Sequence, residues 1–259
     1  MGLGECWFAA ERGLLLCLGS NKIFDDNYVT WKSWGGANSG AAFGHSSAYE
    51  KSYFAKLLQL AGVSGCALNI LEIGFGNGGL MAYCKSEGHS VVGTEANSRL
   101  VTMAQSNGYE VFSADFIETA PTASFDLIIA LDVIEHIEPA HTVSFLQACH
   151  RALKTGGRLV LRFPNGDSPF SASNFNADVT HLNWISADKM RYYAQMSSFS
   201  AMKTQGTPQV ILTKSVPHGL YNLFNLPAKW LLNAMYRLLF YPGRPLNFVA
   251  IDLVAILKK

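Results

Sequence analysis

The stretch from residue 71 to residue 80, LEIGFGNGGL, contains the residues of this chain best suited to hold a nucleotide-like ligand. An apolar run reaches an acid at Glu72, and a turn rich in glycine follows it. Because glycine has no Cβ, the backbone of such a turn can approach a ligand closely. The turn fits two patterns, G-x-G-x-x-G at Gly74, Gly76 and Gly79, and E-x-G-x-G-x-G at Glu72, Gly74, Gly76 and Gly78.

The two patterns predict different cofactors. The first is the fingerprint of dinucleotide-binding domains, which transfer hydride, and the second is typical of S-adenosylmethionine binders, which transfer methyl. Glu95 ends the next expected strand, 21 residues after Gly74, and its carboxylate can accept both ribose hydroxyls of either cofactor. The third strand ends in SADF, where Asp115 can accept from an adenine amino group. Dinucleotide domains do not require an acid there.

Three further segments decide between the patterns. They are SADF (113–116), FDLIIALDVIEHI (125–137) and LKTGGRLVL (153–161), and they follow the glycine turn in order. With these segments the chain resembles the class I S-adenosylmethionine-dependent methyltransferases. It is most similar to the small-molecule branch common in bacterial quinone, polysaccharide and cell-envelope biosynthesis. The resemblance covers about residues 46–212 and, more loosely, the last strand.

The resemblance implies S-adenosylmethionine as the cofactor and S-adenosylhomocysteine as the product. It implies that Glu72 orients the methionine amino group, directly or through water, and that Leu131 lends its carbonyl to the same group. Gly74, Gly76 and Gly78 would line the methionine and ribose portion. An alternative for Glu72 is that its carboxylate only caps the glycine turn.

For the rest of the cofactor, the resemblance implies that Glu95 binds the ribose and that Asp115 and Phe116 bind the adenine. Phe116 would offer a backbone N–H or a stacking face. Two structural alternatives remain open: Asp115 can serve as a helix N-cap before FIETA, and Phe116 can be an ordinary core residue.

Candidate catalytic residues follow the fourth and fifth strands. Methyl transfer to a hydroxyl requires an in-line nucleophile and removal of its proton. His136 lies just after strand four. In the family that the chain resembles, the residue at this position more often shapes the cofactor pocket than takes part in catalysis. Asp178 and His181 occur as DVTH in a long loop after strand five, so His181 is a candidate general base oriented by Asp178. In the alternative, both residues only tie the loop down. No metal-ligand spacing stands out, so no catalytic metal is predicted.

The elements that must position these residues alternate along the chain. Their order predicts an α/β fold with a doubly wound, mostly parallel, seven-stranded sheet of the Rossmann-like methyltransferase type. Helices are expected at 46–62, 78–89, 98–108, 140–157 and 186–199. Strands are expected at 67–74, 90–96, 109–115, 124–133, 158–165, 199–206 and 247–259.

Residues outside this alternation form an N-terminal extension or cap (1–45) and two insertions in the domain of residues 46–259, at about 164–185 and 213–246. Residues 27–40 suggest a loop or lid, or aromatic residues packed on the outside of the domain. Within the second insertion, residues 226–245 predict a helix with Pro227 in its first turn. This helix could lie on a membrane surface, cover a substrate, form a homodimer contact or pack on its own domain.

Bulk composition narrows the function. The chain has 259 residues and a formal net charge of +1, which argues against a nucleic-acid partner. Charged residues are only 15% of the chain, so part of the surface is expected to be apolar. Five scattered cysteines without a C-x-x-C pair favour a reducing cytoplasm.

These observations predict a methyltransferase that acts on a small molecule or on an envelope-type glycan or lipid precursor, most simply at oxygen. Two rivals are an NAD-dependent oxidoreductase and a non-catalytic module that binds S-adenosylmethionine. The SADF segment and Glu72 argue against the first rival. Absence of turnover would favour the second.

Overall fold

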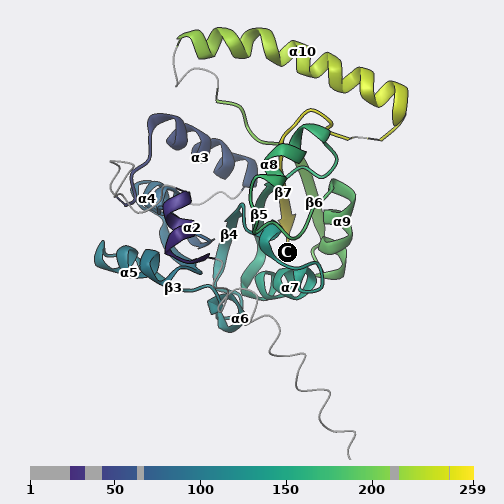
Figure 1. Ribbon diagram of the computed structural model, residues 1–259. Helices are drawn as coiled ribbons and strands as arrows, with labels where there is room; N and C mark the ends of the chain where they lie inside the picture. The colour runs from purple at the N-terminus through teal and green to yellow at the C-terminus, as the bar shows by residue number, and fades with distance from the viewer. Residues whose placement is uncertain (1–23, 33–42, 63–66, 211–215, 245) are drawn as a thin grey trace, which may run out of the picture.

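The computed structural model describes residues 24–32, 43–62, 67–210, 216–244 and 246–259, with the backbone alone for residues 216–224. Its centre is a seven-stranded sheet, as the sequence predicts (Figure 1). The strands are β1 (Asn69–Ile73), β2 (Ser90–Glu95), β3 (Glu110–Ser113), β4 (Phe125–Leu131), β5 (Leu153–Pro164), β6 (Ala201–Gly206) and β7 (Asp252–Lys258).

The order of the strands across the sheet is β3-β2-β1-β4-β5-β7-β6. Neighbours among β1 to β5 pair in parallel, whereas β7 pairs antiparallel with both β5 and β6. The prediction of a doubly wound, mostly parallel sheet is therefore confirmed. A dinucleotide-binding sheet has the order 3-2-1-4-5-6, so the inserted antiparallel β7 favours the methyltransferase interpretation of the glycine turn.

Helices cover both faces of the sheet (Figure 1). They are α2 (Asp26–Trp31), α3 (Ala48–Ala61), α4 (Gly79–Ser86), α5 (Ser98–Ser106), α6 (Phe116–Thr119), α7 (Thr142–Ala152), α8 (Ala172–Asn176), α9 (Ala187–Met196) and α10 (Val216–Phe240). Two 3₁₀ turns, η2 (Ile134–His136) and η3 (Pro169–Ser171), follow β4 and β5. The extra short elements lie where the sequence predicted loops.

The core consists of two layers separated by the sheet. Residues of α6, α7 and α9 pack on one face, together with Leu71 and Ile128. Residues of α3 and α4 pack on the other, together with Ile70 and Ile129. Neighbouring strand residues thus point into opposite layers, as the two-residue period of a strand requires. This burial on both faces explains why β1 and β4 are almost continuously apolar.

Local signals placed most helix ends correctly. Helix α3 begins after Ser47, which forms a capping box with Glu50, and it ends at Gly62 in the left-handed conformation. Helix α7 is an exception, because it ends at Ala152 and not near Gly157 as predicted. Strand β5 already begins at Leu153, which pairs with Phe125 across a register shift.

Gly156 and Gly157, which follow α7, make this register shift possible. A Cβ on Gly157 would lie 2.9 Å from the carbonyl oxygen of Lys154 and 3.1 Å from that of Asp126. Only glycine lets the two strands approach so closely at this point. The glycine pair therefore marks a bulge inside β5, and the sequence pattern of a helix stop was misleading here.

Two predicted boundaries outside the sheet also change. The N-terminal extension is not irregular throughout, because α2 lies within it, capped by the Asp25 side chain. Residues 1–23 and 33–42 of this extension lie outside the described part of the chain. Helix α10 begins at Val216, so Pro227 is inside the helix and not in its first turn. Of the helices in the described ranges, none has the length and apolar character needed to cross a membrane.

Replacing Phe145 by Ala should destabilise the fold strongly. Phe145 is on α7, has no exposed surface and packs in the larger core layer. Removing a buried phenyl ring leaves a cavity that costs about 3–5 kcal/mol of unfolding free energy, measurable by urea denaturation followed by circular dichroism. Val179→Ala, at a side chain that is 89% exposed, is the control and should change stability by less than about 0.5 kcal/mol. A loss below about 1 kcal/mol in Phe145→Ala would contradict this packing.

Candidate active site

A cavity of about 660 Å³ opens at the carboxyl ends of β1, β2 and β4. Ligands of open α/β sheets bind at this edge, where the strand order reverses. The wall includes Glu72, Glu95 and Leu131 at the strand ends, and Asp178 and His181 from the loop after β5. Cofactor and catalytic candidates from four separate segments therefore share one cavity.

The glycine turn forms the floor of this cavity. Gly74, Gly76 and Gly78 all have positive φ, at 72°, 52° and 72°, which favours glycine. Gly74 and Gly76 line the cavity, and a Cβ on Gly74 would lie only 2.7 Å from Cγ2 of Val133. Gly78 is not among the lining residues of this cavity. It is the N-cap of α4, and a Cβ there would meet the ring of Phe43 at 2.5 Å.

Glu72 is suited to hold a positive charge. One part of its carboxylate accepts a hydrogen bond from the backbone N–H of Met81. Oε2 is buried and has no hydrogen-bond partner among the residues that the structure describes. Burial, and next the nearby carboxylate of Glu95, raise the pKa of Glu72 well above its usual range. A cationic amino group beside Oε2, such as the one that S-adenosylmethionine carries, would remove this cost. The role of Glu72 toward that group stays a prediction.

Glu95 links the glycine turn to the end of β2. Its Oε2 accepts from the N–H of Gly76 at 2.9 Å, and its Oε1 accepts from the N–H of Ala96 at 2.7 Å and of Asn97 at 3.1 Å. Burial raises the pKa of Glu95, and these three hydrogen bonds oppose the change. The carboxylate is therefore rigidly held at the cavity wall, where a ribose could bind.

The adenine end differs from the prediction. Of the SADF segment, Ala114 lines the cavity, whereas Asp115 and Phe116 are not among its lining residues. The Asp115 carboxylate instead accepts a hydrogen bond from the hydroxyl of Ser113. The ring of Phe116 stacks on Phe112, with 4.3 Å between the ring centroids. Both side chains lie at the end of β3 next to the cavity and outside its lining.

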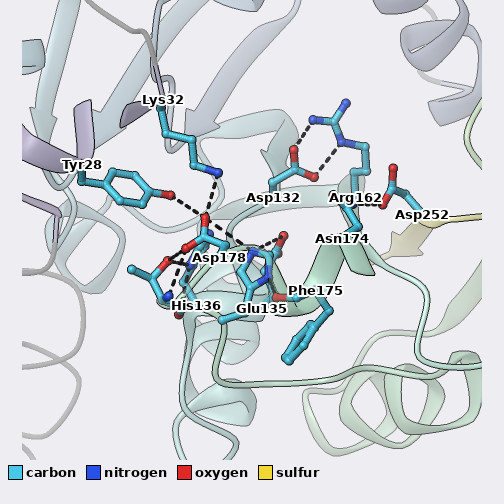
Figure 2. Close-up of polar contacts among 12 residues, drawn as sticks. Tyr28, Lys32, Asp132, Glu135, His136, Arg162, Asn174, Phe175, Asp178 and Asp252 are labelled. Atoms are coloured by element: carbon cyan, nitrogen blue, oxygen red, sulfur yellow. Dashed lines mark hydrogen bonds and ion pairs between the residues drawn. The ribbon is translucent and has the colours of Figure 1, made fainter. Parts of the chain in front are cut away.

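Glu135, His136, Asp178, Thr180 and His181 form a compact set, here called the histidine cluster. All of them except Thr180 line the cavity, and Figure 2 labels Glu135, His136 and Asp178. Turn η2 after β4 supplies the first two residues, and the loop after β5 supplies the others. The carbonyl oxygen of Glu135 accepts hydrogen bonds from the N–H groups of Leu182 and Asn183, at 2.8 and 3.0 Å. This pairing fixes the loop against the turn.

The hydrogen bonds of both histidines in the cluster favour the tautomer with the proton on Nδ1 and a free lone pair on Nε2. Nδ1 of His181 lies 2.8 Å from the carbonyl oxygen of Phe175 and must donate to it. Nδ1 of His136 lies 2.8 Å from Oγ1 of Thr180 and 3.2 Å from the carbonyl oxygen of the same residue. Burial, and next the neighbouring His181, lower the pKa of His136 to about 4. His136 is therefore neutral near pH 7.

Asp178 does not orient His181 by a hydrogen bond. Its Oδ2 lies 3.9 Å from Nε2 of His181, beyond hydrogen-bond reach. Oδ2 instead pairs with Nζ of Lys32 at 2.8 Å and accepts from the hydroxyl of Tyr28 at 3.1 Å (Figure 2). Burial acts to raise the pKa of Asp178, but hydrogen bonds from Lys32 and Thr180 outweigh it and hold this pKa well below its usual range. The carbonyl of Phe175 is thus the orienting group of His181.

Sequence reasoning missed the contribution of α2 to the site. Tyr28 and Lys32 reach Asp178 from residues that the sequence suggested were a loop or lid. Phe24 packs edge-on against His136, with 5.4 Å between the ring centroids. The aromatic character of this segment was a signal, but its partners lie far away in the sequence.

A second missed group surrounds Arg162, near the carboxyl end of β5. Its guanidinium binds the carboxylate of Asp132 through two nitrogens and donates to the hydroxyl of Tyr53 at 3.2 Å. Asp132 has a φ of 56°, an uncommon conformation for a residue other than glycine. All three residues line the cavity, so the ion pair fixes one wall beside Leu131.

The comparisons with known proteins agree with this geometry. Residues 71–161 match the family described as a methyltransferase domain. The chain is 29% identical over 117 residues to the ubiquinone biosynthesis O-methyltransferase of Xanthomonas oryzae pv. oryzae (strain PXO99A), over 42% of this chain and 46% of that protein. The chain spans less than half the length of the curated relatives that it matches in this way.

Solved structures give the same fold. A S-adenosylmethionine-dependent methyltransferase from Archaeoglobus fulgidus superposes with a TM-score of 0.60 and 20% identity, over 81% of this chain and 94% of that chain. Phosphoethanolamine N-methyltransferase 2 of Haemonchus contortus, in complex with S-adenosyl-L-methionine, superposes with a TM-score of 0.61 and 16% identity. This second match covers 95% of this chain and 59% of the other.

Fold and cavity together define a class I S-adenosylmethionine-dependent methyltransferase domain, and the predicted resemblance is confirmed. Residues 71–161 are the part of the chain that matches the family model. The cofactor of this domain is S-adenosylmethionine, and its cationic amino group fits Oε2 of Glu72, which has no hydrogen-bond partner among the described residues of the cavity wall.

Replacing Glu95 by Gln should weaken cofactor binding. The change removes a charged acceptor at the cavity wall, and charge-assisted hydrogen bonds contribute about 1.5–3 kcal/mol. We expect the affinity for S-adenosylhomocysteine, measured by isothermal calorimetry, to fall about 10–100-fold. Glu110→Gln, at an exposed position of β3, is the matched control and should bind like the wild type, and NADH should not bind. Equal affinity in both variants would exclude Glu95 from the cofactor site.

Proposed function

We propose that this protein transfers a methyl group from S-adenosylmethionine to a hydroxyl oxygen of a small molecule or of an envelope-type glycan or lipid precursor. The observation that supports this most directly is the shared cavity. Glu72 and Glu95 line it from the ends of β1 and β2, and Glu135, His136, Asp178 and His181 of the histidine cluster line the same cavity. A cofactor and an acceptor bound there would meet between these two groups of residues.

The division of labour follows from the chemistry of methyl transfer. The cofactor supplies a methyl group already activated on a sulfonium, so the protein must place the acceptor oxygen in line and let its proton leave. Glu72, Gly74 and Glu95 would hold the cofactor. His181 presents the free lone pair of Nε2 in the cavity wall, where it can accept the hydroxyl proton.

The names of the relatives and the lining of the cavity both support a small-molecule acceptor that is methylated at oxygen. The matched curated proteins are named ubiquinone biosynthesis O-methyltransferases, which favours oxygen and a small molecule. On the acceptor side, the aromatic rings of Tyr28, Trp31 and Tyr53 line the cavity. Flat rings of this kind suit an aromatic or partly apolar acceptor.

We also propose that the protein works in a reducing cytoplasm. Cys84 and Cys149 are buried as free thiols. Burial raises the pKa of the Cys84 thiol to about 12, so this thiol stays protonated and inert. Such cysteines need no oxidising compartment.

Replacing His181 by Ala should abolish most of the turnover without loss of cofactor affinity. General-base contributions are about 10²–10⁴-fold, so the rate of labelled methyl transfer to an acceptor panel of catechols and hydroxylated glycans should fall by that factor. Calorimetry with S-adenosylhomocysteine should give the wild-type affinity. His150→Ala, at a half-buried position of α7 outside the cavity lining, is the control with full turnover expected. Wild-type turnover in the His181 variant would remove this residue from the mechanism.

For the partner, we propose that α10 rests on an anionic lipid surface, which would bring the protein to a lipid-linked acceptor. Trp230 and Leu238 are 73% and 75% exposed on this helix, which lies along the outside of the domain (Figure 1). Its other side packs on the following segment, where the ring of Tyr236 stacks on Phe248. Residues 189–251 contain seven Lys or Arg and no Asp or Glu, so the region complements anionic headgroups.

The protein should therefore sediment with vesicles that contain phosphatidylglycerol and much less with neutral phosphatidylcholine vesicles. The double variant Trp230→Ala/Leu238→Ala should lose most of this binding, because it removes the exposed apolar anchors. Tyr192→Ala/Met196→Ala, which removes exposed apolar side chains of α9, is the matched control. A homodimer in light scattering that the α10 double variant converts to monomers, with no vesicle binding, would assign the helix to self-association instead.

A further inference from the structure

We propose that Glu135, His136 and His181 bind a divalent transition-metal ion, with zinc the best match, at the acceptor end of the cavity. These three side chains each offer one ligand atom, and the three atoms lie within 4.8 Å of one another. The role given to the ion below rests on the proposed methyl transfer to oxygen. The binding itself does not.

The donor atoms are correctly prepared for a metal. Both histidines use Nδ1 for a hydrogen bond, His181 to the carbonyl of Phe175 and His136 to Thr180. The hydroxyl of Thr180 lies 2.5 Å from Oδ1 of Asp178 and donates to it, so its oxygen accepts from Nδ1–H of His136. Each Nε2 therefore carries a lone pair. A metal-ligating histidine typically has its second nitrogen held in this way.

The carboxylate of Glu135 points independently to a cation. Glu135 is only 1% exposed, and its Oε2 has no hydrogen-bond partner within the described part of the chain. Oε1 lies 3.9 Å from Nε2 of His181, too far for a hydrogen bond. A buried carboxylate with so few partners is costly, and a bound cation beside it would offset that cost.

The backbone holds the three ligands close before any ion binds. Glu135 and His136 are consecutive in η2, and the carbonyl of Glu135 accepts from the N–H groups of Leu182 and Asn183, directly after His181. Ligand atoms around tetrahedral zinc lie roughly 3.4 Å apart, from Zn–N and Zn–O distances of about 2.0–2.1 Å. Binding thus requires the ligand atoms, now within 4.8 Å of one another, to close by up to about 1.4 Å, which rotation about their χ angles can provide.

The ligand set indicates which ion and which kind of site. Two imidazoles with one carboxylate suit zinc or another transition metal better than magnesium or calcium, which prefer oxygen. Three protein ligands are typical of catalytic zinc sites, which leave a position open. Asp178 lies 3.9 Å from Nε2 of His181, but Lys32 and Tyr28 already occupy its Oδ2. The open position therefore remains for an acceptor oxygen.

An ion here would change how the hydroxyl is activated. It would bind the acceptor oxygen and lower the pKa of its hydroxyl, so the proton would leave to water without a base. The oxygen then forms the new C–O bond as the C–S bond of the sulfonium breaks, and the products are the methyl ether, S-adenosylhomocysteine and one proton. With the ion bound, His181 would act as a ligand, and the role of base proposed above for His181 would apply to the metal-free protein.

The test is a titration of the metal-free protein with Co²⁺, followed by its d–d absorption, and with Zn²⁺ in competition. We expect one equivalent per chain and a tetrahedral-type cobalt spectrum. His181→Ala and Glu135→Gln should each remove this spectrum. Thr180→Val, which removes the partner of His136 Nδ1, should weaken metal affinity about 10–100-fold. His141→Ala and Glu138→Gln remove a partly exposed pair outside the cluster and should bind metal like the wild type.

Calorimetry with S-adenosylhomocysteine on the same samples separates this proposal from the proposed function. A metal-free wild type that binds no Co²⁺, or ligand variants that keep the wild-type spectrum, would overturn the metal site. If the wild type binds metal at the cluster but no S-adenosylhomocysteine, the site stands and the methyltransferase proposal fails. Circular dichroism shows whether a ligand variant is unfolded. If one is, the cobalt spectrum of the wild type and the metal affinity of Thr180→Val decide whether the metal site exists.

Discussion

Parallel pairing of β1 with β2 on one side and with β4 on the other is the constraint on which the site depends. Ile73 aligns with Thr94 in one register and with Ala130 in the other, so the three strands end at the same level. Because side chains alternate along a strand, a slip of one residue would move each of them to the opposite face. The cavity, its acidic wall and the turn that carries two cluster residues all follow from this alignment.

Much of this arrangement was predictable because its signals are local. Ser47 and Gly62 mark the ends of α3, and apolar runs bounded by turns mark the strands. The rule that ligands bind beyond strand ends then led to Glu72 and Glu95. The same local reasoning failed at Gly157, because a glycine pair that shapes a bulge looks like a glycine that stops a helix. The adenine contacts of Asp115 and Phe116 stay predictions, and their side chains already have partners in Ser113 and Phe112.

The acceptor half was less predictable because its contacts join distant parts of the chain. Tyr28 and Asp178 are 150 residues apart and share a buried hydrogen bond. Glu135 meets His181 only because a carbonyl of η2 pairs with the loop after β5. No short spacing in the sequence encodes either contact, so a ligand search by motif finds nothing there. The sequence shows which residue types this half contains, but not which of them lie close together in space.

The position of β7 has a consequence for the order in which the fold can assemble. In space β7 lies between β5 and β6, and β6 joins the sheet only through it. During synthesis, residues 201–206 must therefore wait for residues 252–258 before they gain a hydrogen-bonded neighbour. Until then β5 presents an open edge of largely apolar residues, which is prone to pair with other chains. Nascent chains should be most vulnerable to aggregation in the interval when α10 is being made.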